Sequence, residues 1–494
     1  MRDQKSNYQN IVKTTSILGG AQVLQILVSI VRGKLVAILL GTSGMGINAL
    51  LSSTMTLMAQ LTGMGLDFSG VREISKAREF DSRRLYRIFM SYKHWSYLSI
   101  LFGFVLIILL SPLLSYFSFA NLNYVWAFIF LSVALVFSRL QQMNATLIQG
   151  MRQFSNLAKA ALAGSLLATL LVIPLYYYWG VNGIVPGIIC SFFALWISYR
   201  YFARNIHIGT NYPVSYKASI YEGFPIIKMG LASLTTSLFP TLSLYGINTF
   251  VSHFGSLSDV GLYAAGTSIT TQYVGVIFTA MSTEYYPRLS TVCHDVDKMN
   301  KAVNQQAEIV TLIVAPLMVI MMLTAPFIIT LLLSDEFYQI RDFIIFLAYG
   351  TFFRAASYTV GFISFAKGDK KFFVVWEGVI NSLFVLSYNI IGYLLGGITG
   401  MAIAFLLGYL TYFIVITIVA GRKYGFNFES NYWYLFTKLL ILCSIMLFTA
   451  LVLKGSYLYI TGTFICLTTL YYAYKEFDKR LDVKSILLRY IKKR

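Results

Sequence analysis

A stripe of polar side chains inside the first long apolar segment ends in a residue suited to binding an anion. Four residues recur at the three- and four-residue spacing that places side chains on one face of a helix. They are Gln22, Gln25, Ser29 and Arg32. An arginine near the centre of a bilayer costs about 2.5–3.5 kcal/mol on insertion scales, so such residues usually face a protein interior or a water-filled path. The stripe therefore indicates an internal polar cavity for an anionic cargo.

Two further arginines lie within apolar segments. Arg139 shares a helical face with Gln142, and Arg354 lies about 20 Å along its helix from Arg341. That distance is too long for its side chain to reach the outer surface easily. We expect Arg139, Gln142 and Arg354 to line the cavity with the first stripe. Partial snorkelling of Arg32 to the membrane surface is the alternative for that residue.

Polar residues on two later segments suit hydrogen bonding to a sugar. Tyr245 and Asn248 share one helical face, and Asn381 shares another with Glu377. Contacts between helices explain such residues about as well. We expect Tyr245, Asn248 and Asn381 to line the same cavity.

A coupled cation would require a carboxylate within reach of the membrane interior. Four acidic residues lie at those ends of apolar segments where basic residues gather, so ordinary ion pairing is the alternative to an ion-coupling role. The candidates are Asp67, Glu222, Glu284 and Glu377. The segment that carries Arg32 contains no acidic residue.

Membrane-spanning helices must position these residues. The 494-residue chain is 57% hydrophobic and 12% charged, with a mean hydropathy of +0.68, which is unlike an ordinary soluble protein. About fourteen apolar segments reach the roughly 20 residues that a helix needs to cross a bilayer. We predict an all-α integral membrane protein. The expected spans are 11–40, 43–66, 91–115, 122–148, 157–178, 181–202, 224–251, 259–283, 306–333, 341–365, 373–395, 398–420, 433–453 and 456–474.

Basic residues gather in every second connection between the spans. The connection 67–93 is rich in Lys and Arg, whereas 41–44 and 396–398 contain neither. Lys and Arg are retained on the cytoplasmic side, so we expect both termini to be cytoplasmic. The first apolar segment is too long for a cleaved signal peptide. The net charge of +19 follows from the same bias, and we expect no binding of nucleic acid.

Two stretches of the chain resemble one another. Residues 44–50 (Gly-Met-Gly-Ile-Asn-Ala-Leu) match 259–265 (Asp-Val-Gly-Leu-Tyr-Ala-Ala), and each stretch opens the second span of its half. This indicates a parallel duplication with a substrate site between the halves. We predict an N-lobe at 1–205, a C-lobe at 206–420, a helix pair at 421–474 and a basic amphipathic cytoplasmic tail at 475–494 that lies on anionic lipid headgroups.

The sequence carries no signature of a cofactor, a metal or ATP hydrolysis. The four cysteines and four histidines are scattered along the chain, without the spacing of a disulfide framework or a metal site. No phosphate-binding loop of the form GxxxxGK[ST] occurs. The predicted outward connections are also too short for substrate chemistry, so we expect a transporter and not an enzyme such as a polymerase or ligase.

Two N-terminal stretches carry a resemblance to a known family. Residues 30–47 (Ile-Val-Arg-Gly-Lys-Leu-Val-Ala-Ile-Leu-Leu-Gly-Thr-Ser-Gly-Met-Gly-Ile) and 61–74 (Leu-Thr-Gly-Met-Gly-Leu-Asp-Phe-Ser-Gly-Val-Arg-Glu-Ile) resemble the signature of Wzx-type polysaccharide flippases. These belong to the multidrug/oligosaccharidyl-lipid/polysaccharide (MOP) exporter superfamily. The resemblance implies two six-helix lobes arranged in a V that alternate between inward and outward openings.

The resemblance also implies a cargo and partners. The cargo would be an undecaprenyl-diphosphate-linked oligosaccharide, such as an O-antigen or capsule repeat unit, flipped from the cytoplasmic to the periplasmic leaflet of the bacterial inner membrane. The partners would be membrane lipids, a glycan polymerase and the chain-length machinery. The family places functional arginines in its first helix, which favours Arg32, whereas Arg139 and Arg354 match no family motif.

Two related functions stay open. A flippase for a peptidoglycan lipid precursor would share the fold and the cationic cavity. A multidrug or cation antiporter of the same superfamily would be expected to carry a carboxylate in the cavity, where this chain offers arginines.

Overall fold

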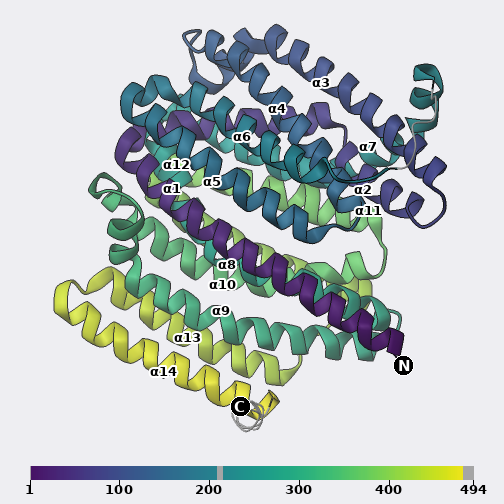
Figure 1. The fold of residues 1–494 in the computed structure, drawn as a ribbon. Coiled ribbons are helices and arrows are strands. Elements are labelled where there is room, and N and C mark those ends of the chain that lie inside the picture. The colour runs from purple at the N-terminus through teal and green to yellow at the C-terminus, as the bar shows by residue number, and fades with distance from the viewer. Residues whose placement is uncertain (1, 209–214, 482–494) are drawn as a thin grey trace, which may run out of the picture. The chain divides into compact units, whose positions relative to one another are not determined.

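The described part of the chain is almost entirely helical, as Figure 1 shows for the computed structural model. Eight helical stretches are long and apolar enough to cross a membrane, which confirms the predicted all-α membrane architecture. The chain divides into two compact units, Met1–Gly261 with Leu332–Ser334, and Leu262–Leu331 with Asp335–Arg494. The structure describes residues 2–208 and 215–481, with side chains placed except at 2–19, 21, 232, 271–274, 276–277, 279–284 and 481.

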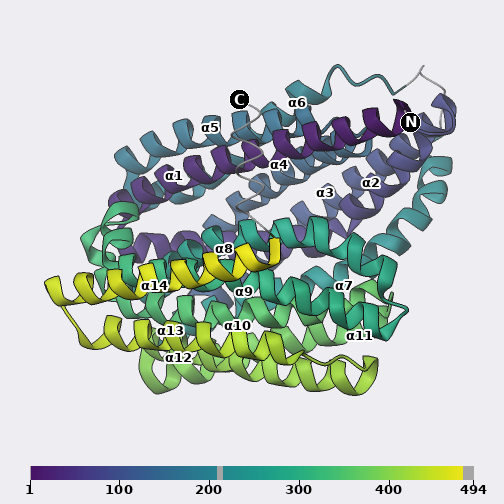
Figure 2. The same cartoon turned by 90° about the horizontal axis from the view of Figure 1, so that it is seen from below.

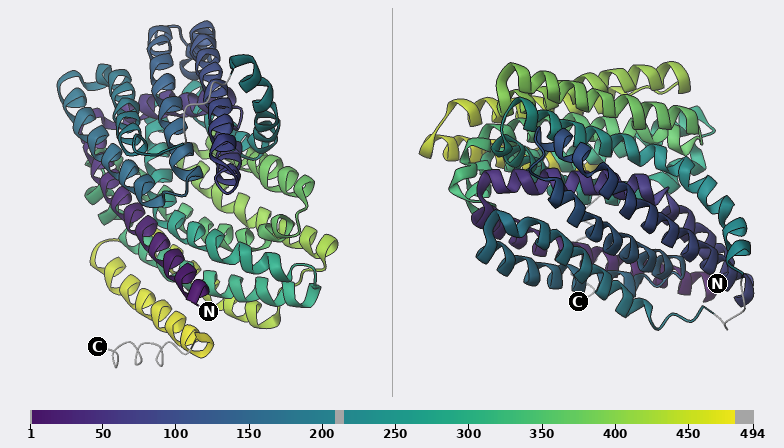
Figure 3. Two further views of the ribbon diagram at one scale, coloured as in Figure 1. Left: turned by 45° about the vertical axis from the view of Figure 1, so that its right-hand side comes forward. Right: turned by 90° about the horizontal axis from the view of Figure 1, so that it is seen from above.

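The first unit contains the helices up to the start of α8. They are α1 (Arg2–Gly63), α2 (Leu66–Ala77), α3 (Ser82–Phe119), α4 (Val125–Gly150), α5 (Phe154–Trp179), the 3-10 turn η1 (Gly180–Gly183), α6 (Ile184–Ala203) and α7 (Tyr216–Phe254). The first half of α1 lies beside α5, which the views in Figures 1 and 3 agree in showing.

The second unit contains most of the remaining helices. They are α8 (Leu257–Val292), α9 (Val296–Leu332), the 3-10 turn η2 (Asp335–Ile340), α10 (Arg341–Ala366), α11 (Lys370–Phe373), the π-helical turn η3 (Val374–Ile380), α12 (Asn381–Tyr424), α13 (Ser430–Val452) and α14 (Gly455–Leu481).

Two of the long helices each contain two predicted spans. α1 passes through a kink at Gly41, whose φ of 64° lies in the left-handed region that favours glycine. α12 passes through a kink at Gly396 and Gly397, and Gly397 has a φ of 58°. These kinks fall on the connections predicted at 41–44 and 396–398. The predicted spans are therefore all found as helix, with two connections reduced to a change of direction.

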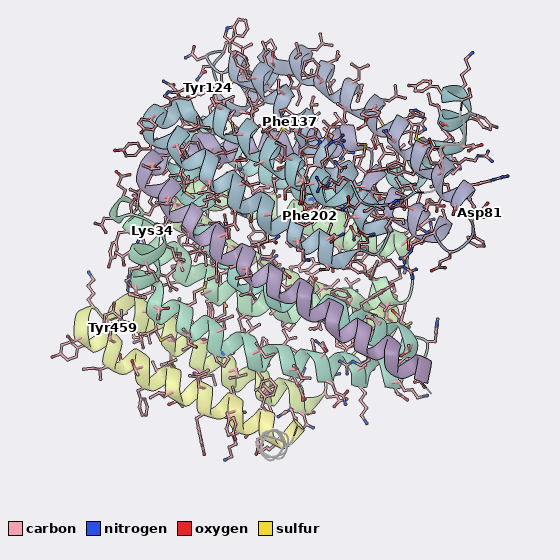
Figure 4. All side chains as sticks on the ribbon, viewed as in Figure 1. Lys34, Asp81, Tyr124, Phe137, Phe202 and Tyr459 are labelled. Carbon is pink, nitrogen blue, oxygen red and sulfur yellow. The ribbon has the colours of Figure 1, made fainter. Side chains whose placement is uncertain are left out.

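The basic connection predicted at 67–93 differs from expectation, because most of it is helical. α2 begins just after Gly65, whose φ is 64°, and α3 begins just after Asp81 (Figure 4). Within α2, Leu66 and Ile74 are buried while the basic Lys76 is exposed. This is the pattern of an amphipathic helix, which the high charge of the segment obscured.

Helix α7 packs within the first unit, although the sequence analysis assigns it to the C-lobe. It contacts α1, α2 and α3. A Cβ on Gly65 would overlap the carbonyl oxygen of Gly230 on α7, so glycine at both positions lets the backbones meet. The indole of Trp95 donates to the carbonyl oxygen of Ile220 at 3.0 Å. The lobe boundary at 205/206 stays a prediction.

The two stretches that resemble one another in sequence meet where α1 crosses the start of α8. Gly46 and Gly261 occupy equivalent positions in the two stretches. A Cβ on Gly46 would overlap the carbonyl oxygen of Leu257, and a Cβ on Gly261 would overlap that of Thr42. The Ser258 hydroxyl donates to Thr42 Oγ1 at 2.8 Å beside them. Small residues allow such close helix crossings in membranes, so this crossing requires both glycines.

The last two helices run side by side in the second unit (Figure 2). Arg480 near the end of α14 pairs with Glu308 of α9 at 2.6 Å and with Glu476 at 2.5 Å. Tyr459 projects outward from α14 (Figure 4) and is 47% exposed. Of the predicted tail at 475–494, the structure describes only the end of α14; the remainder, 482–494, lies outside the described residues.

Hydroxyl groups inside the helices mostly bond to their own helix. Thr54 donates to the carbonyl oxygen of Leu50 at 2.8 Å, and Thr351 donates to that of Leu347 at 2.7 Å. Thr469 on α14 repeats the arrangement with a carbonyl oxygen four residues earlier, at 2.7 Å. These groups are thereby satisfied without a partner from another helix.

Candidate functional site

Arg32 is held in the first unit by α5 and α6. Its Nη2 donates to Ser191 Oγ at 3.0 Å, and the buried Tyr176 of α5 also interacts with the guanidinium. Ser29 donates to the carbonyl oxygen of Ile26 at 2.8 Å. Of the two glutamines in the predicted stripe, Gln22 is exposed and Gln25 is half-buried. Arg32 itself is half-buried and keeps its positive charge next to neutral hydroxyl groups.

Arg139 forms a buried ion pair with Asp67. Its Nη1 donates to Asp67 Oδ2 at 2.7 Å and its Nη2 to Asp67 Oδ1 at 3.2 Å. Only 5% of Arg139 is exposed. The hydroxyl of Tyr92 lies 3.4 Å from Asp67 Oδ1. A Cβ on Gly63 would lie 2.8 Å from Arg139 Nη1, so the glycine leaves room for the guanidinium.

This ion pair joins two residues for which the sequence predicts separate roles, Arg139 in the cavity and Asp67 in ion coupling. A two-point contact of this kind is geometrically specific and among the stronger side-chain interactions. It compensates the charge of Arg139, which would otherwise be costly to bury. A role of Arg139 as an anion ligand stays a prediction and would require the pair to open.

The remaining predicted residues of the first unit take part in helix contacts. The hydroxyl of Tyr245 on α7 lies 3.2 Å from that of Ser118 on α3, and Ser118 lies 3.3 Å from the hydroxyl of Thr54 on α1. Asn248 is buried, and its Oδ1 has no hydrogen-bond partner in the described part of the chain. Gln142 is half-buried on α4.

Arg354 in the second unit has a different environment from Arg139. Its guanidinium carbon lies 5.2 Å from the ring centre of Phe278 on α8 and 5.5 Å from that of Tyr409 on α12. Among the side chains that the structure places, no carboxylate lies within ion-pair distance of it. Aromatic faces attract cations but carry no net negative charge. These two rings therefore do not compensate the charge of Arg354.

A small hollow lies between the two halves of α12, and its lining includes Tyr409, one of the two rings beside Arg354. Asn381 lines the same hollow, while its role in binding the cargo stays a prediction. The structure thus brings Arg354 and Asn381 to the same region through Tyr409. The full lining is Asn381, Phe384, Val385, Tyr388, Asn389, Ala404, Phe405, Gly408, Tyr409 and Tyr412.

The candidate acidic residues have different environments. Glu222 pairs with Arg87 of α3, with Nε 3.2 Å from Oε2, so the two helices are joined by an ordinary ion pair. The side chain of Glu284 lies outside the described residues. Glu377 lies on the π-helical turn, and its Oε1 is buried without a hydrogen-bond partner among the described groups. No cluster of three or more potential metal ligands is found in the described part of the chain.

The aromatic partners of Arg354 and the tyrosines of α12 were missed by the sequence analysis. Phe405, Tyr409 and Tyr412 recur at four- and three-residue spacing, which is the helical signal that would have placed them on one face. Phe278 carries no comparable signal in the sequence, because its relation to Arg354 depends on how α8 and α10 pack.

Solved structures of two transporters have a similar fold. The structure of the lipid II flippase MurJ in an inward closed conformation matches with a TM-score of 0.72 at 14% identity, covering 95% of this chain and 99% of that chain. An inward-facing multidrug resistance MATE family transporter of the MOP superfamily matches with a TM-score of 0.66 at 16% identity, covering 81% and 94%. The chain therefore shares the fold of these two transporters.

The sequence places the chain more narrowly. The polysaccharide biosynthesis protein family matches residues 35–342, which is more than half of the chain, so the protein belongs to this family. The chain is 23% identical over 411 residues to the Lipid III flippase of Escherichia coli (strain K12), covering 82% of this chain and 96% of that protein. The Lipid III flippase of Shigella flexneri gives the same figures. Membership of the family confirms the resemblance carried by the two N-terminal stretches.

Proposed function

We propose that this protein is a flippase that moves an undecaprenyl-diphosphate-linked oligosaccharide, such as an O-antigen or capsule repeat unit, from the cytoplasmic to the periplasmic leaflet of the bacterial inner membrane. It acts as a transporter and catalyses no covalent step. The observation that carries the proposal is Arg354, a half-buried arginine held between two rings with no carboxylate placed beside it. The likeness to Lipid III flippases over 96% of their length supports a lipid-linked cargo.

The chemistry of such a cargo explains why these residue types are needed. A diphosphate is expensive to transfer into hydrocarbon unless cations accompany it. The glycan requires hydrogen-bonding groups in place of water, while the lipid tail can stay in the bilayer. Arg32 and Arg354 supply charge to the diphosphate, and Gln22, Gln25, Ser29, Gln142, Tyr245, Asn248 and Asn381 supply polar groups to the glycan.

The transport cycle follows from two lobes that alternate in access around the bound cargo. Both termini face the cytoplasm in this arrangement, and the basic tail lies on anionic lipid headgroups. The glycan polymerase and the chain-length machinery take over the product on the periplasmic side.

A flippase for a peptidoglycan lipid precursor is the second candidate. The TM-score of 0.72 with the lipid II flippase MurJ favours it, and the same arginines would serve a diphosphate in that cargo. A multidrug antiporter is less well supported, because the predicted span 11–40 carries Arg32 and no carboxylate.

Deletion of the gene tests the proposal directly. We expect the full-length lipid-linked oligosaccharide to build up in the inner leaflet while surface polysaccharide is lost. Unchanged surface glycan together with altered sensitivity to cationic drugs would support the antiporter. Growth arrest with accumulated peptidoglycan precursor would support the second candidate.

Point variants then test the anion-binding residues. Arg32→Ala and Arg354→Ala should each abolish complementation of the deletion while the amount of protein in the membrane stays the same. Arg152→Ala is the matched control, because Arg152 forms an exposed pair with Glu79 at 2.6 Å. Full activity in both test variants would rule out the role of these arginines in anion capture.

A further inference from the structure

Glu377 occupies an unusual place in the second unit. It lies on the π-helical turn Val374–Ile380, between α11 and α12. Single turns of π-helix are rare and often occur at functional sites. A Cβ on Gly361 of α10 would overlap Glu377 Oε1, so the missing side chain at Gly361 makes room for the carboxyl group. Two local features thus combine to place one carboxyl group against the backbone of α10.

The carboxyl group has one polar side chain facing it. The hydroxyl of Tyr412 on α12 interacts with Glu377, yet neither Glu377 Oε1 nor the Tyr412 hydroxyl makes a hydrogen bond in the described structure. Tyr412 belongs to a buried apolar cluster with Val360 and Ile363, and Trp376 packs against that cluster. The carboxyl group therefore lies in a region of low polarity.

Three cations on or next to the neighbouring helices have other partners. On α10, Arg354 lies over Phe278 and Tyr409, and Lys367 Nζ donates to the carbonyl oxygen of Cys293 at 2.7 Å. On α12, Lys423 pairs with Asp369 at 2.6 Å.

Helix α8 also carries titratable groups. The hydroxyl of Tyr285 donates to the carbonyl oxygen of Thr359 at 2.9 Å, and the side chain of Glu284 lies outside the described residues. Among the placed side chains, no Lys, Arg or His pairs with Glu377. Among the described residues, no cation therefore compensates its negative charge.

An ionised carboxylate in such surroundings is costly, and a proton removes the cost. We propose that Glu377 and Tyr412 form a proton-binding site that couples transport to a proton gradient. In the ionised state the Tyr412 hydroxyl donates to the carboxylate. After uptake of one proton, the carboxylic acid donates to the Tyr412 oxygen instead. The coupling rests on the proposed flippase function, whereas proton binding itself does not.

A proton fits this site better than a metal cation does. Hard metal cations take several oxygen ligands, commonly six or more for Ca²⁺. The described surroundings of Glu377 supply one carboxyl group and one phenol, and no group of three or more His, Cys, Asp or Glu residues is found in the described chain. One carboxyl group is sufficient for a proton.

Proton binding can be measured without any transport substrate. Infrared difference spectra of the purified full-length protein, recorded from about pH 5 to about pH 9, report the carbonyl stretch of protonated carboxylic acids. We expect a pH-dependent band that is lost in Glu377→Gln and kept in the control Glu79→Gln, which alters an exposed carboxylate paired with Arg152. Glu377→Asp should keep a titrating band at a shifted position. A band that persists in Glu377→Gln would overturn the site, as would its absence in the wild-type protein.

Coupling is measured in vesicles that contain the protein and an undecaprenyl-diphosphate-linked saccharide. A gradient of one pH unit should change the wild-type rate of flipping by up to about tenfold, the ratio of proton concentrations. Glu377→Gln should flip at a rate that no longer depends on the gradient. An equal response in the variant would overturn the coupling, and so would a response that disappears when sodium is replaced by potassium. If no flipping occurs in any sample, the proposed function fails while the infrared result still decides proton binding.

Discussion

Two sites, one in each unit, differ in whether an opposite charge compensates their buried charged groups. In the first unit, Arg139 is nearly inaccessible and is paired at two points with Asp67. In the second unit, Arg354 lies over aromatic rings and Glu377 faces the phenol of Tyr412. A compensated pair stabilises one arrangement of its helices, whereas an uncompensated group gains from binding a charged partner. The comparison suggests that the Arg139–Asp67 pair fixes the packing of its helices, whereas Arg354 and Glu377 keep their charges available for binding.

Removing one partner of the buried pair should have the largest effect on stability. Arg139→Leu leaves Asp67 without its cation, and breaking a buried pair in this way costs about 3 kcal/mol. The midpoint of thermal unfolding of the detergent-purified protein measures the loss. The double variant Arg139→Leu with Asp67→Leu should recover much of it, because no uncompensated charge then remains. Equal stability of the single and the double variant would mean that the pair does not hold the first unit together.

The next largest effect on stability is expected where α1 crosses α8 at Gly46 and Gly261. Gly46→Ala and Gly261→Ala each place a methyl group against a carbonyl oxygen of the opposing helix, which should cost about 2 kcal/mol through forced separation of the backbones. The double variant should lose less than the sum, since one separation accommodates both methyl groups. Gly33→Ala is the control, because a Cβ there meets nothing within 4 Å. Simple additivity of the two changes would argue against a shared crossing.

The arginine of the second unit should contribute less to stability than that of the first. Arg354→Met removes the charge above Phe278 and Tyr409 but keeps much of the side-chain volume. A double-mutant cycle with Tyr409→Leu should give a coupling energy of about 0.5–1 kcal/mol. A coupling several times larger would show that Arg354 is as firmly fixed as Arg139, and the contrast between the units would disappear.

The smallest effect is expected for the partly exposed pair of Asp369 and Lys423. The Lys423 ammonium, 2.6 Å away, holds the pKa of Asp369 below its ordinary value. The resulting stability is present above the unfolded pKa of about 3.9 and is lost as the pH falls through the lower folded pKa. Asp369→Asn should therefore cost under about 1 kcal/mol at pH 7. Unfolding midpoints measured down to about pH 2 should converge with those of the wild-type protein, and a difference that persists in acid would contradict this origin.

Hydrophobic segment length predicted most of the fold, because the bilayer dictates how long an apolar helix must be. The predicted spans reappear as helices, and the connections at 41–44 and 396–398 coincide with glycine kinks. The length of hydrophobic segments gave a wrong prediction where a helix is rich in charged residues. The sequence predicts a connection in place of α2, because the polar face of this helix is rich in charge. Leu66 and Ile74 nevertheless mark a buried face.

The site was less predictable, because partners far apart in the chain decide what a charged residue does. The spacing of Arg139 and Gln142 gave a common helical face, yet nothing local indicates that Asp67, 72 residues away, would pair with the arginine. The polarity of Arg354 and Asn381 is visible in the sequence. Tyr409 lies beside Arg354 and lines the same hollow as Asn381, and this position depends on how α12 packs against α10. The π-helical turn under Glu377 likewise has no signature in the sequence.

The hydroxyl groups that bond to their own helix bear on how the chain enters the membrane. Thr54, Thr351 and Thr469 each carry their acceptor with them, four residues earlier on the same helix. Such a helix can leave the insertion machinery for lipid alone, before any neighbour has arrived, without exposing an unsatisfied hydroxyl to hydrocarbon. Asp67 and Arg139 lie 72 residues apart, so they can pair with each other only after α4 has been made. During synthesis, α1 and α2 must therefore wait for α4 before the first unit can close around its ion pair.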